Sequence, residues 1–289
     1  MTTHATTANP GSALAFGAAL GYCLQNVGVR ALLDGGGISV WGILFTRGLM
    51  GLVVVALAAR LFHVNVFGKN RRLLALIGLF GAASSACSTM AFSMIPLYQA
   101  LVLLYLYPAL SVPLNLLVNR TRIRQGDGLL VLAAFAGCAL LIWPDETTGL
   151  SLSMGHLIGC ASAVLYSLAY VCIARLGEDN SGLEPLCYYS FWAVIGVGVG
   201  MLVSGHNAGL GDPGLFVSGL GVGLLALAAL LMGYAALRWI EPYKVGTIGM
   251  LEVFGGALSS WLLFHDPMSP RAVLGGLVIL VAALRLRRA

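Results

Sequence analysis

The chain has 289 residues, of which 59% are hydrophobic and 9% are charged, and its formal net charge is +5. Soluble globular domains carry charges at about a quarter of their positions, so this composition excludes a soluble protein. Because the basic residues gather between apolar runs, where membrane proteins place them, the positive balance does not indicate nucleic-acid binding. We therefore expect an all-α polytopic membrane protein without a nucleic-acid partner.

Apolar runs long enough to cross a hydrocarbon core of about 30 Å as helices repeat along the whole chain. The segment before the first run lacks the basic start of a signal peptide, so we expect that run to be a retained span. The predicted spans are ten: 13–32, 40–61, 73–94, 97–118, 129–143, 154–176, 186–203, 215–237, 245–264 and 272–286. Within the fourth, Tyr107-Pro108 predicts a kink.

Arginine and lysine are divided unevenly between the two sides of these spans. Ten spans place both termini on one side, which collects thirteen basic residues; the other side has Arg30 and Arg271, and Arg47 lies inside a span. The positive-inside rule therefore predicts that both termini are cytoplasmic. The expected cytoplasmic tails are 1–12 and 287–289.

The sequence matches itself at an offset of about half its length. Four matched pairs are 145 residues apart: Ile95/Ile240, Tyr98/Tyr243, Gln99/Lys244 and Thr89/Tyr234. A fifth pair, Tyr22/Tyr166, is 144 residues apart. We expect two five-helix repeats at 13–143 and 154–286, joined by a linker at 144–153. Because each repeat has an odd number of spans, the second must be inverted, as in many secondary transporters.

Polar and aromatic side chains inside the spans are candidates for a substrate site, because at membrane depth they face the protein interior or a watery cavity. Tyr22, Gln25 and Asn26 share one helix face, and interhelical hydrogen bonding is their alternative role. For the small-residue stripe that carries Thr89, helix packing is the stronger interpretation. The candidate substrate-binding residues are Tyr22, Gln25, Asn26, Thr89, Tyr105, Tyr107, Tyr166, Tyr170, Tyr234 and Glu252.

Glu252 is the sharpest of these candidates, because a carboxylate near the middle of a span costs ~2.5–3.5 kcal/mol on insertion scales. It must be either protonated or paired, and Arg47 is the deeply placed charge that could pair with it. A structural ion pair or a neutral hydrogen-bonded acid is one interpretation. Proton coupling or binding of a substrate amine is the other.

Catalytic, metal and cofactor sites are not predicted. The six cysteines form no CxxC pair, and the five histidines lie near loops or span ends without metal-ligand spacing. The sequence has no P-loop motif, which argues against direct ATP drive. We expect a protein that is not an enzyme and has no cofactor; an intramembrane enzyme is the more distant alternative.

The hairpin at 91–110, its run Leu104–Pro108, and the counterpart ending in Leu251-Glu252-Val253 resemble drug/metabolite transporters of the EamA type. Many members have proline where this chain has Val253. The tyrosine-rich fourth span and the overall length are similar to YddG-type bacterial amino-acid exporters. The resemblance implies ten spans in two copies, a central cavity between them, and export across the bacterial inner membrane.

These observations together predict a secondary transporter that exports small metabolites by alternating access. Tyrosines with few fixed charges suit a neutral or zwitterionic solute. The resemblance adds that the most favoured substrates are amino acids, including aromatic or apolar ones. A multidrug or quaternary-cation exporter is the alternative. The expected partners are the small-molecule substrate and the lipid bilayer, with the chain a monomer or a weak oligomer.

Overall fold

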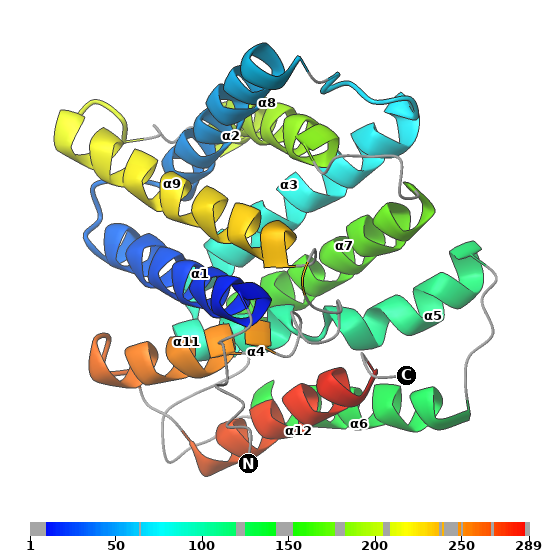
Figure 1. The fold of residues 1–289 in the computed structure, drawn as a ribbon. Helices are drawn as coiled ribbons and strands as arrows, with labels where there is room; N and C mark the ends of the chain where they lie inside the picture. Colours follow the sequence, from blue (N-terminus) through cyan, green and yellow to red (C-terminus); the bar gives the residue numbers. More distant parts are fainter. Residues whose placement is uncertain are drawn as a thin grey trace, which may run out of the picture.

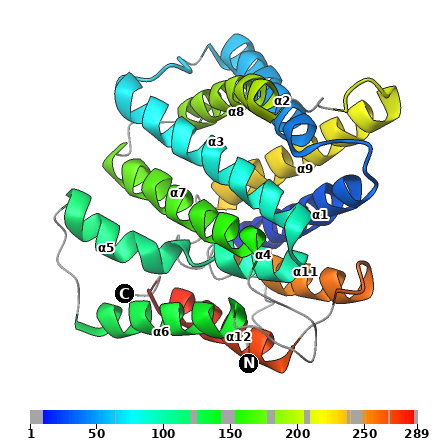
Figure 2. The ribbon, with the colours of Figure 1, turned by 180° about the vertical axis from the view of Figure 1, so that it is seen from behind.

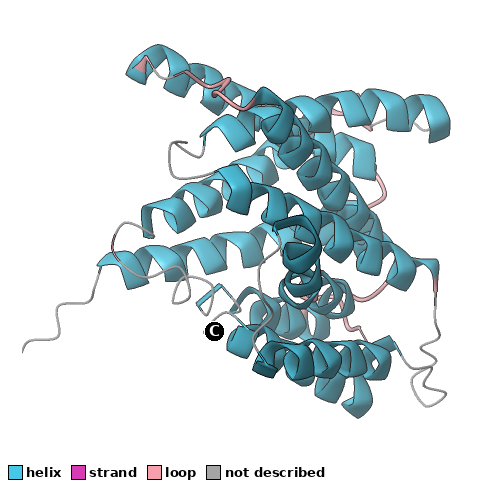
Figure 3. Ribbon diagram, turned by 90° about the vertical axis from the view of Figure 1, so that its right-hand side faces the viewer, coloured by secondary structure: helices cyan, strands magenta, loops and turns pink. Residues whose placement is uncertain are grey.

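The computed structural model describes residues 10–63, 65–119, 125–142, 153–176, 183–204, 209–236, 239, 248–249, 251–266 and 269–286. In these residues the regular structure is helical throughout (Figure 3). The helices are α1 (Pro10–Asp34), α2 (Val40–Phe62), α3 (Arg71–Met94), α4 (Leu97–Leu104), α5 (Tyr107–Asn119), α6 (Gln125–Ile142), α7 (Met154–Leu176), α8 (Leu183–Ser204), α9 (Pro213–Ala236), α11 (Leu251–Leu262) and α12 (Pro270–Leu286).

Six of these helices are long and apolar enough to cross a membrane: α1, α2, α3, α7, α8 and α9. Shorter apolar stretches lie in α4 with α5, in α6 and in α12. Each of the ten expected spans falls mainly on helical residues, although residues 143, 237, 245–247 and 250 of these spans lie outside the described residues. The structure thus agrees with an all-helical polytopic membrane protein, while the count of ten crossings stays a prediction.

The fourth expected span is divided into α4 and α5 by a turn at Tyr105 and Leu106. Pro108 explains the position of this break. Proline has no N–H to bond the carbonyl four residues earlier, at Leu104, so the helical hydrogen-bond pattern cannot continue through it. The chain tightens instead, with the Leu106 N–H donating to the Leu103 carbonyl at 3.0 Å. The predicted kink is therefore present as a full interruption that begins just before Tyr107.

The hairpin between α3 and α4 follows from Pro96. A residue before proline is pushed out of the helical region, and Ile95 is extended, with φ −135° and ψ 160°. The two helices consequently meet at a sharp corner. Because α4 then runs through the middle of the bundle, its residues Leu97–Leu103 are buried on every side, as expected for a helix that is apolar all round.

The long helices pack as pairs. In Figures 1 and 2, α1 lies along α9, α3 along α7, α2 along α8, and α6 along α12. If the first five expected spans are laid in order on the last five, the α1/α9 pair becomes the α7/α3 pair, and the other two pairs map onto themselves. Two equivalent repeats would produce this pattern of contacts. The inverted orientation and the boundaries of the repeats stay predictions.

A tight polar contact joins the α3/α7 pair. The hydroxyl of Ser84 donates to the carbonyl of Ser162 at 2.9 Å, and both residues are buried. Ser84 lies beside the small-residue stripe of Ser85, Thr89 and Ser93, and Ser85 itself accepts a hydrogen bond from the Tyr189 hydroxyl of α8 at 3.1 Å. Helix packing as the role of the stripe stays a prediction.

Candidate functional site

Glu252, in the first turn of α11, is held by donors from two other elements. The amide nitrogen Nδ2 of Asn26 on α1 donates to Oε1 at 2.7 Å, and the hydroxyl of Tyr105 donates to Oε2 at 2.9 Å. Both donor residues are buried. A carboxylate inside a membrane protein needs such partners, because hydrocarbon offers it none.

Tyr105 occupies the break between α4 and α5, which explains how its hydroxyl reaches α11. Besides Glu252, the hydroxyl lies 3.1 Å from the carbonyl oxygen of Gly249. That carbonyl belongs to backbone just before α11, so the Tyr105 side chain contacts both the backbone and the Glu252 carboxylate at this point of the chain. The sequence indicated Tyr105 and Glu252 separately but contained no sign that they bond to each other.

A cluster of tyrosine rings lies beside this carboxylate. The ring of Tyr107 meets that of Tyr166 edge-on, with centroids 4.7 Å apart, and lies 5.8 Å from Tyr170 and 6.1 Å from Tyr105. The hydroxyl of Ser167 also donates to the Tyr107 carbonyl, which fixes the start of α5 against α7. Tyr166 and Tyr170 remain 41% and 49% exposed. The structure thus groups four of the predicted tyrosines, and Ser167 is a supporting residue that we did not predict.

The face of α1 that carries Asn26 also carries Tyr22 and Gln25. Tyr22 is half-buried one turn before Asn26. Gln25 is 2% exposed, and its Nε2 has no hydrogen-bond partner among the described residues. A buried amide donor without a partner is uncommon in folded proteins and calls for an explanation.

Thr89 and Tyr234, two other predicted substrate-binding residues, are not part of the group around Glu252 that is described above. The hydroxyl of Thr89 is fully buried and donates to the Ser85 carbonyl of its own helix at 2.8 Å. Tyr234 lies on α9, with its side chain outside the described part of the chain. A role for either in substrate binding stays a prediction.

Arg47 does not form the ion pair with Glu252 that the sequence suggested as one option. Within the described residues, the ion pair observed is Arg30 with Asp34, and Glu252 is hydrogen-bonded to Asn26 and Tyr105 instead. The neutral donors Asn26 and Tyr105 therefore take the place of the expected counter-ion.

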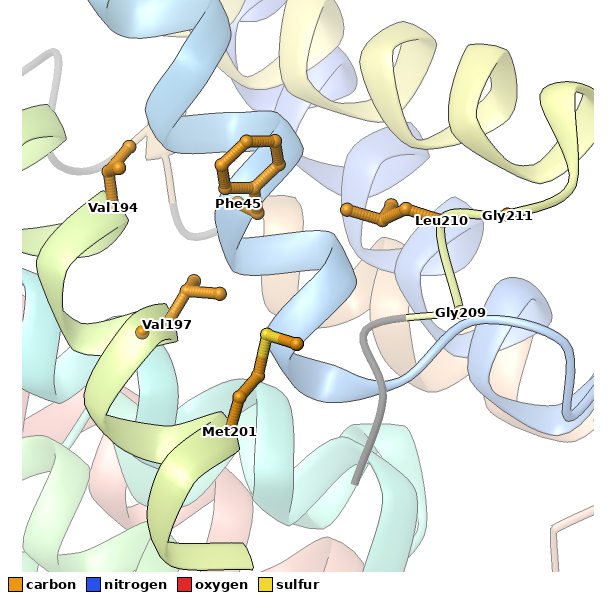
Figure 4. Close-up of a pocket in the computed structure, with 8 residues that line it drawn as sticks. Phe45, Val194, Val197, Met201, Gly209, Leu210 and Gly211 are labelled. Carbon is orange, nitrogen blue, oxygen red and sulfur yellow. The ribbon is translucent and has the colours of Figure 1, made fainter. Parts of the chain in front are cut away.

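An apolar hollow of ≈ 600 Å³ lies elsewhere, between α2, α8 and the turn at 209–211 (Figure 4). Its side-chain lining includes Phe45, Val194, Val197, Met201 and Leu210. These side chains offer no polar group to a metabolite, so we place the candidate site at Glu252. The described residues also include no group of three or more His, Cys, Asp and Glu side chains that could hold a metal ion.

Tyr105→Phe should lower transport about tenfold, because it removes a hydrogen bond to a charged or acidic group that is worth ~1.5–3 kcal/mol. Initial rates in proteoliposomes, normalised to the amount of reconstituted protein, would test this. Tyr188→Phe is the matched control, since the Tyr188 hydroxyl donates to the Phe67 carbonyl at an exposed position. Equal rates for the two variants would contradict a positioning role for Tyr105.

Comparison with known proteins agrees with a transporter. Residues 153–287 match the EamA-like transporter family. An uncharacterized transporter from Archaeoglobus fulgidus is 22% identical over 230 residues, which cover 79% of this chain and 81% of the relative. A protein of known crystal structure, 17% identical, shares the fold with a TM-score of 0.58 over 94% of each chain. The family match and the relative together support a membrane transporter of the drug/metabolite transporter superfamily.

Proposed function

We propose that the whole chain is an EamA-type secondary transporter that exports amino acids, including aromatic or apolar ones, by alternating access. In this proposal ten spans form two inverted repeats in the bacterial inner membrane, with both termini in the cytoplasm. A membrane transporter of this kind acts on a small molecule without chemical conversion, so the protein is not an enzyme.

The observation that carries the proposal is the hydrogen-bonded group of Asn26, Tyr105 and Glu252, which we call the Glu252 cluster. These residues come from α1, from the break between α4 and α5, and from the start of α11, so the cluster joins the two predicted repeats. Secondary transporters commonly place their substrate at such an interface, beside an interrupted helix. A bound solute that competes for Glu252 would change the contacts between the repeats, which is the coupling that alternating access requires.

The chemistry of these groups suits an amino acid. The Glu252 carboxylate can accept hydrogen bonds from a substrate ammonium, and the unpartnered Nε2 of Gln25 can donate to a substrate carboxylate. The Tyr107, Tyr166 and Tyr170 rings offer an apolar and aromatic surface to the side chain. Each part of a zwitterion thus has a matching group.

The alternative is export of quaternary or aromatic cations. It is favoured by the same carboxylate next to several tyrosine rings, because a cation is attracted to the face of an aromatic ring. The two kinds of substrate differ in whether Gln25 would bind them. An amino acid has a carboxylate that can accept a hydrogen bond from Nε2 of Gln25, whereas a quaternary cation has none.

Counterflow in proteoliposomes decides between them. Purified protein is reconstituted with a high internal concentration of one unlabelled compound, and uptake of labelled amino acids and labelled lipophilic cations is compared. We expect accumulation of at least one amino acid with an aromatic or apolar side chain above that in protein-free liposomes. Accumulation of the cations alone would favour the alternative, and Gln25→Leu should then leave the rate unchanged.

A further inference from the structure

Arg30 ties three separate segments together at one end of the bundle. Its guanidinium donates to the carbonyl oxygens of Phe92 and, at 3.0 Å, of Ile95, where α3 ends. It also pairs with Asp34, one turn further along α1, at 2.9 Å. The same group lies over the ring of Phe264, just after α11, at 5.8 Å from the centroid. We call Arg30, Asp34, Phe92, Ile95 and Phe264 the outer latch.

The geometry of these contacts is specific to arginine. The last carbonyls of a helix have no partner within it and carry a partial negative charge, so a cation at the end of α3 is stabilised there. The planar guanidinium can serve two carbonyls, a carboxylate and a ring face at once, which a lysine ammonium cannot. The Arg30 side chain is 15% exposed, so solvent screens these contacts only in part.

A second polar bridge closes the same end between α4 and α7. Nε2 of His156 lies 3.0 Å from Oε1 of Gln99, and both residues are buried. The backbone N–H of Ser153 donates to the other ring nitrogen of His156, which leaves Nε2 as the donor to Gln99. This end of the bundle is therefore held by side chains from α1, α4 and α7.

The last turn of α7, which carries Arg175, lies at the opposite end of the bundle. In Figure 1 the last turns of α1 and α11 lie on the left of the bundle, whereas the last turn of α7 lies on the right. The charge bias of the sequence predicts that the left end is outside and the right end is in the cytoplasm. The contacts of Arg30 and His156 therefore lie at the predicted outer end.

Three members of the outer latch recur in the sequence at one offset. Arg175, Asp179 and Ile240 each stand 145 residues after Arg30, Asp34 and Ile95, respectively. Arg175 lies in the last turn of α7, the counterpart of α1 in the predicted repeat. Asp179 and Ile240 are outside the described residues, so the recurrence at those two positions is a statement about sequence alone. At this offset Arg175, at the predicted inner end of the second repeat, corresponds to Arg30 at the predicted outer end of the first, whereas Tyr22/Tyr166 pairs the same two helices at an offset of 144.

We propose that Arg30 is the latch residue of an outer gate and that Arg175 is its counterpart for the inner end, so that the two arginines stabilise opposite states. The inference rests on the alternating access proposed above. In the state seen here the outer latch is made, and opening toward the outside requires Arg30 to leave the end of α3. Removing Arg30 therefore favours the state that is open to the outside. Removing Arg175 favours the state that is closed to the outside.

Distances between spin labels on α1 and α3 test this without any substrate. Ala31 and Ser93 are exposed at the outer ends of these helices and are not members of the latch. Cysteines at both positions, in a chain whose six native cysteines are replaced with alanine, would be labelled and measured by double electron–electron resonance in liposomes. With wild-type Arg30 we expect a dominant short-distance population.

In Arg30→Gln we expect the ratio of long- to short-distance populations to rise about tenfold, since hydrogen bonds to a charged group are lost. Arg175→Gln should lower the ratio. Arg271→Gln is the matched control, an exposed arginine on the same side of the membrane, and should leave the ratio unchanged. If Arg30→Gln is not monodisperse on size exclusion, Arg30→Lys replaces it, with a smaller rise expected.

An unchanged ratio in the Arg30 variant, or the same rise in Arg271→Gln, would overturn the latch. A rise in Arg175→Gln would overturn the assignment of Arg175 as its counterpart. The transport proposal fails separately: counterflow without amino-acid accumulation, combined with the expected distance shifts, would remove the substrate class and leave the latch in place.

Discussion

Glu252→Gln is expected to reduce amino-acid transport by about 10- to 100-fold and to abolish the pH dependence of what remains. The substitution keeps the size of the side chain but removes the charge that would bind a substrate ammonium, and charge-assisted hydrogen bonds are worth ~1.5–3 kcal/mol. Asn26 and Tyr105 can both adapt, since an amide can turn its oxygen toward the new NH₂ group and a hydroxyl can accept. The fold should therefore persist while the acid–base group is lost.

The measurement is the initial rate of exchange in proteoliposomes at a series of pH values, together with substrate binding to the purified protein. Glu184→Gln is the matched control, because Glu184 is also buried but lies in the first turn of α8, outside the Glu252 cluster. We expect the control to keep the pH profile of the wild type. A Glu252→Gln protein with the wild-type rate and pH profile would show that Glu252 has only a structural role.

The partners of Glu252 could be predicted from the sequence to exist but could not be identified. An acidic residue inside an apolar run is visible in the sequence, and the cost of burying it predicts that it has partners. The partners themselves depend on how α1, α4 and α11 cross. Hydropathy has no information about that crossing, so the search for a partner favoured the one other deeply placed charge over Asn26 and Tyr105.

Arg30 was missed for a related reason. The positive-inside rule uses each basic residue only as a marker of topology. By that rule Arg30 is an exception, because it lies on the predicted outer side, which has few basic residues. Apart from the ion pair with Asp34, its contacts are with two backbone carbonyls and a phenylalanine ring, groups so common that they distinguish no position in a sequence. The signal that could have found it is the recurrence of Arg30 and Asp34 at 175 and 179.

The helices themselves were easier to predict than their contacts. The run at 154–176 coincides with α7, because a long apolar segment bounded by polar loops has one stable form in a membrane. The break at Tyr105 lies earlier than the kink expected at Tyr107-Pro108, because proline disturbs the turn that precedes it. Glycine patterns are less informative: Gly196 and Gly200 have the spacing of a close helix contact, yet Gly200 lies against Trp41 while Gly196 has no neighbour within 4 Å of an added Cβ.

Gly78→Ala is expected to be the most destabilising single-methyl change among the described helix contacts of α3. A Cβ on Gly78 would lie 2.5 Å from the carbonyl carbon of Tyr188 and 2.7 Å from its oxygen. These atoms belong to the backbone of α8 and cannot rotate away, so α3 and α8 must separate. Overpacking of this kind costs ~1–3 kcal/mol, which predicts a drop of roughly 5 °C in the apparent melting temperature.

The melting temperature can be followed in detergent by size-exclusion chromatography after heating. Gly196→Ala and Gly198→Ala on α8 are the controls, because an added Cβ at either position meets nothing within 4 Å. Alanine is also the better helix former by ~0.5–1 kcal/mol, so these two variants should melt at or above the wild-type temperature. If Gly78→Ala behaves like the controls, α3 and α8 do not pack at the distance described. The link they provide between the first half of the chain and the second would then have to be made by other helices.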